Sequence, residues 1–355
     1  MILRLSILSL LGIVLFQIAT AGQPGSGFIE DYPEKYARKF VYLYDDEGQN
    51  TGMVKYGPGG NRYGREVYKY NDQGHRILEA VYNNEDKVEK KTRYYYDDYG
   101  NLKEQTRIGP DSVILARDTY SYDRRMNRTE WKSYTEKGEL EWKRTYEYTS
   151  DDRRKEERRY NGNRELVQRY IFSYDENGLM TEQNVYGPQG DILWRYIYRH
   201  DHNGNRLGVL WYDDDDRLRW IRRYVYDESG NRVEERRYEP SRSFFFGRWT
   251  YRLTYRFTFR YDDQGRQIEE SVYDNYDNLL WRRNYGYNRD GLLQDYVWYD
   301  SRGNEEMRYL MLYNDDGQRT GWTWYDGRGN VEWHRSYNYN EEGRLKSEIW
   351  YGEVY

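Results

Sequence analysis

The fold of this chain is decided by stretches such as RYIFSYDENGLMTEQNVYGPQGDILW, residues 169–194. Two tyrosines of this stretch, Tyr174 and Tyr186, are each followed by a short turn sequence, DENG or GPQG. Asp at the first turn position and Gly at the fourth fit a type I turn closed by a residue with left-handed backbone, which is a common hairpin connection. Each half of the stretch therefore predicts one strand followed by a hairpin turn.

The same unit recurs along the chain with a period of 26 residues. The fourth residue of the DENG-type turn falls at positions 48, 74, 100, 126, 152, 178, 204, 230, 265, 291, 317 and 343. Gly occupies ten of these twelve positions, and Met126 and Asp152 occupy the others. The step from 230 to 265 is 35 residues, so one repeat has a nine-residue insertion near 239–250.

Two anchor positions define each repeat. The first anchors are residues 44, 70, 96, 122, 148, 174, 200, 226, 261, 287, 313 and 339. The second anchors lie twelve residues later, at 56, 82, 108, 134, 160, 186, 212, 238, 273, 299, 325 and 351. Tyr occupies 22 of the 24 positions, and the exceptions are His200 and Ile108. Chance does not produce this spacing, so residues 36–355 are predicted to form a single repeat domain.

The segments between the turns have the length and alternation of strands. Apolar side chains eight, two and zero residues before each first anchor share one face of such a strand, because side chains alternate. The sequence therefore predicts an all-β fold of twelve repeats and about 24 strands, a long, coiled antiparallel meander that is superhelical or shell-like. The Tyr columns are expected to form cross-strand ladders, and charges such as those of RKEERRY at 154–160 are expected to stay in solvent. A propeller of six 52-residue blades fits the same count, although nothing in the sequence marks such a blade.

The composition favours a secreted product. Residues 1–21 have one charge, Arg4, an apolar run and an Ala-Thr-Ala ending, which predict a signal peptide followed by a lead-in at 22–35. The alternative is that this segment is retained as a membrane anchor. The chain has no Cys, 44 Tyr and 12 Trp, and a net charge of −5 with mixed signs, which argues against a nucleic-acid partner. We expect a protein that is secreted or held at the cell surface, with the periplasm as an alternative compartment, and no membrane span after cleavage.

The recurring Tyr-Asp-x-x-Gly turn resembles that of the YD-repeat (RHS-repeat) family. The matching turns run from Tyr44 to Gly48, from Tyr174 to Gly178, from Tyr226 to Gly230 and from Tyr261 to Gly265. The resemblance implies a spiralling β-sheet shell, a place at the cell surface and carbohydrate binding. The period here is longer than in that family, and we do not expect toxin delivery. The paired half-repeats are also similar, more loosely, to MORN-variant repeat proteins.

Catalytic and metal-binding patterns are weak, so we expect no enzyme activity, no cofactor and no metal. His200-Asp201-His202 has the residue types of a metal or acid/base cluster, but it falls on a repeat turn. Asp213 to Asp216 offers carboxylates for calcium, but it also falls on a turn and lacks the spaced oxygen ligands of a calcium loop. Both are interpreted as turns exposed to solvent.

Aromatic side chains are the candidates for binding. Five tryptophans lie six residues before a first anchor, namely Trp142, Trp194, Trp220, Trp281 and Trp333, and the insertion contains Phe244, Phe245 and Phe246. A row of flat rings along a sheet can stack against sugar faces or a protein partner, and the alternative is that the rings fill the interior of the sheet. The first hypothesis is a non-catalytic surface module that binds a glycan or a protein. The second is a structural protein that self-associates through its sheet edges.

Overall fold

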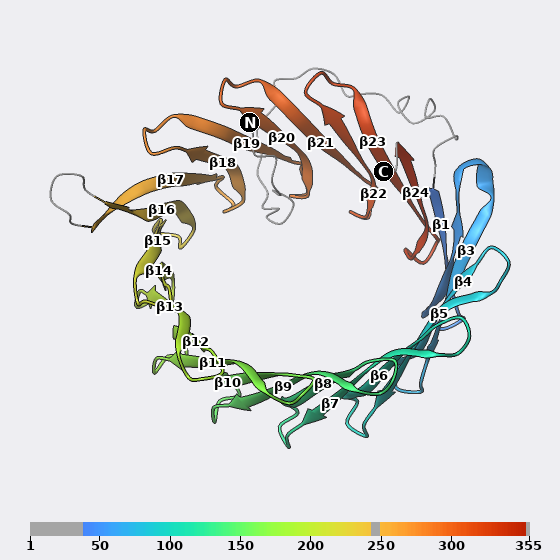
Figure 1. The fold of residues 1–355 in the computed structure, drawn as a ribbon. Helices are drawn as coiled ribbons and strands as arrows, with labels where there is room; N and C mark the ends of the chain where they lie inside the picture. The colour runs from blue at the N-terminus through green and yellow to red at the C-terminus, as the bar shows by residue number, and fades with distance from the viewer. Residues whose placement is uncertain (1–37, 243–248, 353–355) are drawn as a thin grey trace. The chain divides into compact units, whose positions relative to one another are not determined.

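The computed structural model describes residues 38–242 and 249–352, and these residues form an all-β structure (Figure 1). The 24 strands are joined as regular antiparallel hairpins, which confirms the predicted fold class and strand number. Apart from the 3₁₀ turn Pro58–Gly60 (η2), the described residues contain no helix, and hence no helix long and apolar enough to cross a membrane. The expected signal peptide and lead-in, residues 1–35, and the candidates Phe244, Phe245 and Phe246 lie outside the described residues.

The strands divide into two compact units. The Arg38 unit comprises Arg38–Ile221 and Tyr339–Glu348, and the Arg222 unit comprises Arg222–Asn338 and residues 349–352. The strands up to the boundary are β1 (Arg38–Tyr44), β2 (Asn50–Tyr56), β3 (Arg62–Tyr70), β4 (Arg76–Asn83), β5 (Val88–Tyr96), β6 (Leu102–Ile108), β7 (Ile114–Tyr122), β8 (Arg128–Tyr134), β9 (Leu140–Tyr148), β10 (Arg154–Asn161), β11 (Leu166–Tyr174), β12 (Met180–Tyr186), β13 (Ile192–His200), β14 (Arg206–Tyr212) and β15 (Leu218–Tyr226). The remaining strands are β16 (Arg232–Arg242), β17 (Trp249–Tyr261), β18 (Gln267–Tyr273), β19 (Leu279–Tyr287), β20 (Leu293–Asp300), β21 (Glu305–Tyr313), β22 (Arg319–Asp326), β23 (Val331–Tyr339) and β24 (Leu345–Gly352).

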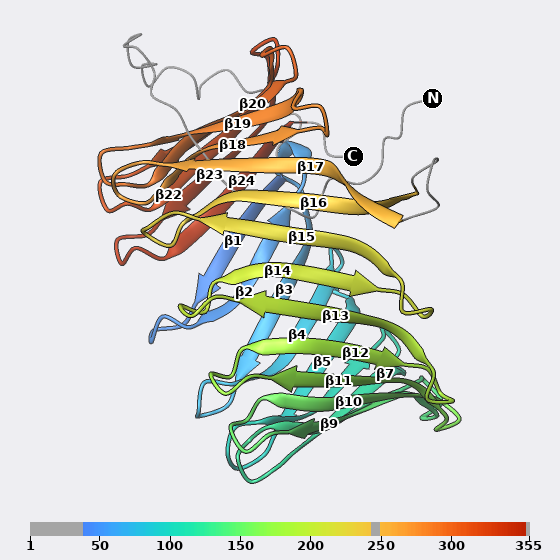
Figure 2. The same ribbon diagram turned by 90° about the vertical axis from the view of Figure 1, so that its left-hand side faces the viewer.

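Strand order follows the sequence within each unit. In Figure 2, β9 to β14 lie side by side, and each is paired with the next through an antiparallel register. The nine-residue insertion lengthens the β16–β17 hairpin, whose strands have 11 and 13 residues where the other strands have seven to nine.

The turns are closed by the residues that the sequence predicts. In the turn after β15, the Asp227 carboxylate accepts hydrogen bonds from the backbone N–H groups of Ser229 and Asn231, at 3.0 and 2.8 Å. Gly230 closes the turn with φ +82°, a left-handed conformation that costs Gly little. Met126 and Asp152, the two exceptions to the Gly rule, also adopt left-handed backbone, with φ of 65° and 60°. The turn geometry is therefore kept where the side chain departs from the pattern.

In each hairpin from β1 to β14 and from β16 to β23, one extra residue lies next to the anchor. In β19 and β20, for example, Gly286 is opposite Asp295 whereas Tyr287 is opposite Leu293, so one residue of β20 has no partner. Such a bulge shifts the alternation of side chains by one position. As a result, the first and second anchors lie on opposite faces of the sheet. We call the face of the first anchors the anchor face.

Most first anchors are held by a hydrogen bond from the Tyr hydroxyl to a backbone carbonyl. The Tyr174 hydroxyl donates to the Arg154 carbonyl at 2.8 Å, twenty residues earlier. The same bond recurs in Tyr70, Tyr96, Tyr122, Tyr148, Tyr287 and Tyr313, and in Tyr261 with the insertion added to the separation. The carbonyl that accepts belongs to the first residue of the preceding strand, so the bond ties consecutive repeats together.

The second anchors are held by cations on the opposite face. Arg65 lies over the Tyr82 ring at 4.0 Å, and Arg282 lies over the Tyr299 ring at 5.0 Å. In both cases the basic residue is the direct register partner of the tyrosine. A guanidinium over an aromatic ring is attracted by the ring quadrupole.

Replacing Tyr174 with Phe should lower the free energy of unfolding by about 1 kcal/mol, because the ring stays and the Arg154 carbonyl loses its donor. Tyr174→Ala, which also removes the ring, should cost about 2–4 kcal/mol. Urea unfolding followed by circular dichroism measures both values. Tyr99→Phe is the matched control, because Tyr99 is 82% exposed on a turn. Equal stabilities of Tyr174→Phe and the unsubstituted chain would show that the hydrogen bond contributes nothing.

The anchor of the first described repeat, Tyr44, forms its hydrogen bond with the last repeat. The Tyr44 hydroxyl donates to the Leu345 carbonyl at 2.9 Å, and Tyr42 donates to the Glu348 carboxylate at 3.2 Å. All four residues belong to the Arg38 unit. Strand β1 pairs with both β2 and β24, so it has a strand neighbour on each side.

The expectation that the charges of residues 154–160 stay in solvent is wrong. Glu156 and Glu157 are 6% and 3% exposed, and each is paired with Arg residues. The Arg169 Nε atom lies 2.7 Å from Glu156, and the hydrogen bond from Arg169 is the main cause of the lowered pKa of Glu156. Arg158, from the same stretch, has its Nε atom 2.6 Å from the same carboxylate. Neighbouring strands bring these opposite charges together, which the segment alone does not show.

Candidate binding surface

The anchor face collects aromatic rings from both kinds of strand. Because of the bulge, side chains at even distances before a first anchor share this face with side chains at odd distances before a second anchor. Trp298, one residue before the second anchor Tyr299, is thus the register partner of Arg283, and Trp324 is the partner of Trp333. The face is therefore more densely aromatic than a row of tryptophans on every second strand.

In the Arg222 unit these rings form a continuous series, which we call the aromatic row. Its members are Tyr285, Tyr296, Tyr309, Trp322, Trp333 and Trp350. Successive ring centroids are 5.9, 4.5, 5.5, 4.4 and 5.9 Å apart, the distances of rings in contact. Trp324 also contacts Tyr309 at 6.2 Å.

Burial changes along the aromatic row. Tyr285 is 1% exposed and packs against Ile268, Tyr287, Leu293 and Tyr296. Trp322 and Trp333, by contrast, are only half-buried. Burial raises the pKa of the hydroxyls of Tyr285 and Tyr296, so both stay neutral. One end of the row is thus core, and its other rings keep a surface that a ligand can reach.

Guanidinium groups lie among these rings. The Arg335 guanidinium carbon is 3.9 Å from the Trp350 ring centroid and 4.7 Å from that of Trp333. Arg283, 7% exposed, lies 4.2 Å from the Trp298 centroid and 4.7 Å from that of Trp281. Its Nη1 atom is 3.4 Å from Glu270, so the charge of Arg283 is balanced inside the protein.

A second group of rings lies in the Arg38 unit. Trp194 contacts Tyr170 at 6.1 Å and Tyr196 at 5.1 Å. Trp220 contacts Tyr196 at 5.7 Å and Trp211 at 6.1 Å. Among the tryptophans predicted from the sequence, Trp194 and Trp220 are therefore linked through Tyr196.

The five predicted tryptophans occupy four places. Trp194 and Trp220 belong to the group in the Arg38 unit, whereas Trp333 is in the aromatic row and Trp281 contacts Trp298 at 5.0 Å. Trp142, on β9, is 46% exposed and is the most exposed of the five. The other four are half-buried.

Sequence reasoning missed the rings of the shorter strands. These are Trp211, Tyr296, Trp298, Trp322, Trp324 and Trp350, all one or three residues before a second anchor. Their odd distance from the second anchor is visible in the sequence. Without knowledge of the bulge, however, it predicts that these rings lie on the face opposite the anchor face.

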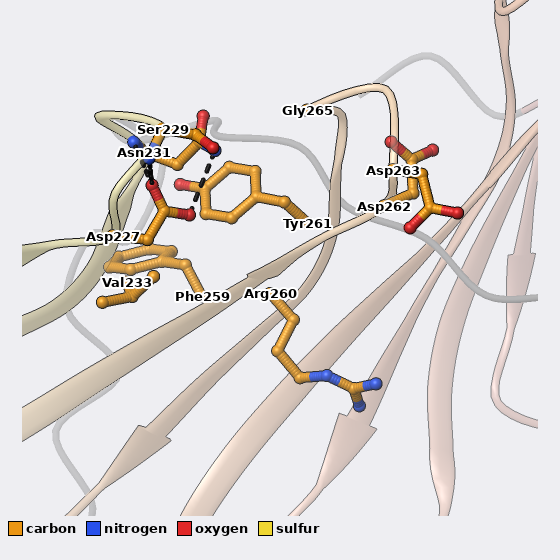
Figure 3. Close-up of a pocket in the computed structure, with 10 residues that line it drawn as sticks. All are labelled: Asp227, Ser229, Asn231, Val233, Phe259, Arg260, Tyr261, Asp262, Asp263 and Gly265. Carbon is orange, nitrogen blue, oxygen red and sulfur yellow. Dashed lines mark hydrogen bonds between the residues drawn. The ribbon is translucent and has the colours of Figure 1, made fainter.

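An open hollow of about 580 Å³ lies between the turn after β15 and the turn after β17 (Figure 3). Val233 and the 7% exposed Phe259 contribute apolar lining, and Asp227, Asp262 and Asp263 contribute carboxylates. Hydrogen bonds, first the one from the Asn231 backbone, lower the pKa of Asp227. Burial opposes ionisation of Asp262, but hydrogen bonds from Arg266 leave its pKa lowered as well.

These two carboxylates are ionised and already serve as turn caps, and the Tyr261 hydroxyl donates to the Arg232 carbonyl at 2.9 Å. Neither Asp227 nor Asp262 is therefore suited to donate a proton as a general acid.

The two clusters interpreted from the sequence as turns, His200-Asp201-His202 and Asp213 to Asp216, lie at hairpin turns in the structure. Asp201 accepts hydrogen bonds from the backbone N–H groups of Asn203 and Asn205, and Asp213 accepts them from those of Asp215 and Arg217. Across residues 38–242 and 249–352, no three His, Asp or Glu side chains meet in a group that could hold a metal ion.

The fold defines the class of protein: an all-β repeat protein built from Tyr-anchored hairpins. No family model matches the sequence, and no curated protein matches it. Among solved structures, the chain is similar to the crystal structure of TcdB2-TccC3, at 11% identity over 87% of this chain and 20% of that one, with a TM-score of 0.45. It is also similar to the Photorhabdus luminescens Tc holotoxin pore, at 13% identity over 86% and 21% of the two chains, with a TM-score of 0.30.

A porin-like protein from Bacteroides uniformis is similar at 9% identity over 90% of this chain and 97% of that one, with a TM-score of 0.22. The chain spans about one fifth of the length of the first two structures. At these levels of similarity, none of the three indicates a function for this chain.

Proposed function

We propose that the chain is a secreted or cell-surface binding module without catalytic activity, and that its ligand is an extended polymer, a glycan chain or a segment of another protein. The observation that carries the proposal is the aromatic row, in which half-buried rings from successive strands form one continuous surface. Flat aromatic faces stack on the apolar faces of sugar rings and on apolar side chains. The Tyr-Asp-x-x-Gly turns support a place beside the YD-repeat proteins, which the sequence resembles.

Two carboxylic acids, Glu270 and Asp295, have raised pKa values, and their positions support the absence of catalysis. Burial raises the pKa of Glu270 and of Asp295. Glu270 is the register partner of Arg283, and Asp295 is the partner of Gly286, three residues further along β19. The two acids therefore lie on opposite faces of the sheet and cannot act on one substrate as a pair.

The second candidate, self-association through the terminal edges of the sheet, has less support. Strand β1 already has a neighbour on each side, because it pairs with β2 and β24. A strand paired on both sides offers no open edge for addition.

Replacing Trp322 and Trp333 together with Ala should weaken binding to the cognate polysaccharide about thirtyfold, since each stacked ring contributes on the order of 1 kcal/mol. Isothermal titration calorimetry against a panel of soluble glycans measures the affinity. Trp131→Ala is the matched control: Trp131 is also half-buried and contacts Arg144, but it lies in the other unit.

Two results would contradict the proposal. The first is unchanged affinity in the double variant together with weakened affinity in the control. The second is an intact chain that binds neither a glycan of the panel nor an envelope protein. Circular dichroism of the variants shows whether the sheet is preserved.

A further inference from the structure

The lengthened β16–β17 hairpin extends beyond its neighbour β18. The register of β17 with β18 begins at Arg256, which is opposite Tyr273, the last residue of β18. The register of β17 with β16 continues further, to Trp249 opposite Arg242. Residues 249–253 of β17 are therefore paired with β16 on one side and extend beyond β18 on the other.

The two outer edges of this extension differ. On β16, Pro240 is opposite Tyr251 and has no backbone N–H to donate, so that edge is blunted against strand addition. On β17, the segment Thr250-Tyr251-Arg252-Leu253 has no Pro, one charge and two residues, Thr250 and Tyr251, of types enriched in strands. Thr250, Tyr251 and Arg252 are exposed, Tyr251 by 40%. An exposed strand edge of this composition is a template for pairing with another strand.

The segment is complementary to a second copy of itself. In an antiparallel two-fold pair centred on Tyr251, that residue is opposite its own copy and Arg252 is opposite Thr250 of the other chain. No like charges face each other, and two aromatic rings meet at the axis. Arg252 also has a partner within the chain, because it donates to the Tyr276 hydroxyl at 2.9 Å and lies over the Tyr276 ring at 5.4 Å.

We propose that two copies of this chain associate by antiparallel pairing of β17 residues 249–253, which gives a two-fold dimer with a sheet continued from one copy to the other. The occupant of the edge is thus a second copy of the same segment. This interaction surface is separate from the aromatic row, so it does not depend on the proposed glycan function.

The test uses opposite charges at the two-fold axis. Sedimentation velocity of the full chain should show a reversible monomer–dimer equilibrium. Tyr251→Lys and Tyr251→Glu should each weaken the dimer at least about tenfold, because each places like charges directly opposite one another and removes the ring pair. An equimolar mixture of the two variants should recover dimers, since Lys then faces Glu. Tyr99→Lys and Tyr99→Glu, at the 82% exposed turn residue, are the matched controls and should leave the equilibrium unchanged.

Three results would overturn the proposal: a chain that stays monomeric up to its solubility limit, a dimer that both Tyr251 variants leave intact, or a mixture that associates no better than either variant alone. Tyr251 is partly exposed, so the variants should fold, and their circular dichroism spectra should match that of the unsubstituted chain.

Discussion

Replacing Tyr285 with Ala should lower the free energy of unfolding of the Arg222 unit by about 3–5 kcal/mol, in the range of other large aromatic truncations at fully buried sites. Tyr285 is 1% exposed and is the residue around which Ile268, Tyr287, Leu293 and Tyr296 pack. Its truncation leaves a cavity between three strands, because the surrounding side chains are held by the sheet and relax only in part.

Equilibrium unfolding in urea, followed by tryptophan fluorescence, measures this cost. Repeat proteins can unfold in parts, so amide hydrogen exchange across β18, β19 and β20 should show where stability is lost. Tyr99→Ala is the matched control: Tyr99 is 82% exposed, and its truncation should cost less than about 0.5 kcal/mol. Similar costs at the two positions would mean that Tyr285 is not a core residue.

Replacing Arg283 with Met should cost up to about 3–5 kcal/mol at neutral pH, because it takes the ion-pair partner away from the half-buried Glu270 carboxylate. Met keeps the length of the side chain between Trp281 and Trp298 and removes the charge that lies 3.4 Å from Glu270. Adding Glu270→Gln to this variant should recover most of the loss, since no buried charge is then left unpaired.

The stability that Arg283→Met loses should be larger at neutral pH than at acid pH. Burial raises the pKa of Glu270 above the ordinary Glu value of 4.5, and the charge of Arg283 opposes this rise. Without Arg283 the pKa rises further. The folded state then favours the protonated acid, so stability is present below pH 4.5 and is lost as pH rises through the raised pKa.

Urea unfolding at pH 4 and at pH 7 should therefore show a smaller difference between Arg283→Met and the unsubstituted chain at the lower pH. Arg217→Met is the control, because Arg217 and its partner Asp215 have 66% and 58% of their side-chain surface exposed. Its cost should stay under about 0.5 kcal/mol at both pH values. A difference for Arg283→Met that grows toward acid pH would contradict the assignment of Glu270 as the unpaired group.

The repeat period and the turns could be read from the sequence because they depend on neighbouring residues. The Tyr anchors and the Asp and Gly positions set the period, and the strands fall between the turns as predicted. Met126 and Asp152 keep the left-handed backbone of the Gly that they replace. Local backbone preferences and alternation are properties of short segments, so spacing alone is enough to predict them.

The candidate binding surface could be predicted only in part. The tryptophans six residues before the first anchors were visible as a pattern, but Trp298, Trp322 and Trp350 were not assigned to the same face. One extra residue in each hairpin decides the face, and the register pairs that reveal it join residues of different strands.

The sequence by itself determined the number of strands, the turn chemistry and the position of the long hairpin. The tertiary structure alone decided three things: the burial of Glu156 and Glu157 among Arg residues of neighbouring strands, the hydrogen bond from Tyr44 to Leu345, and the extension of β17 beyond β18. Each depends on which strands become neighbours and in what register. That is settled by packing between distant segments, and a local pattern contains no record of it.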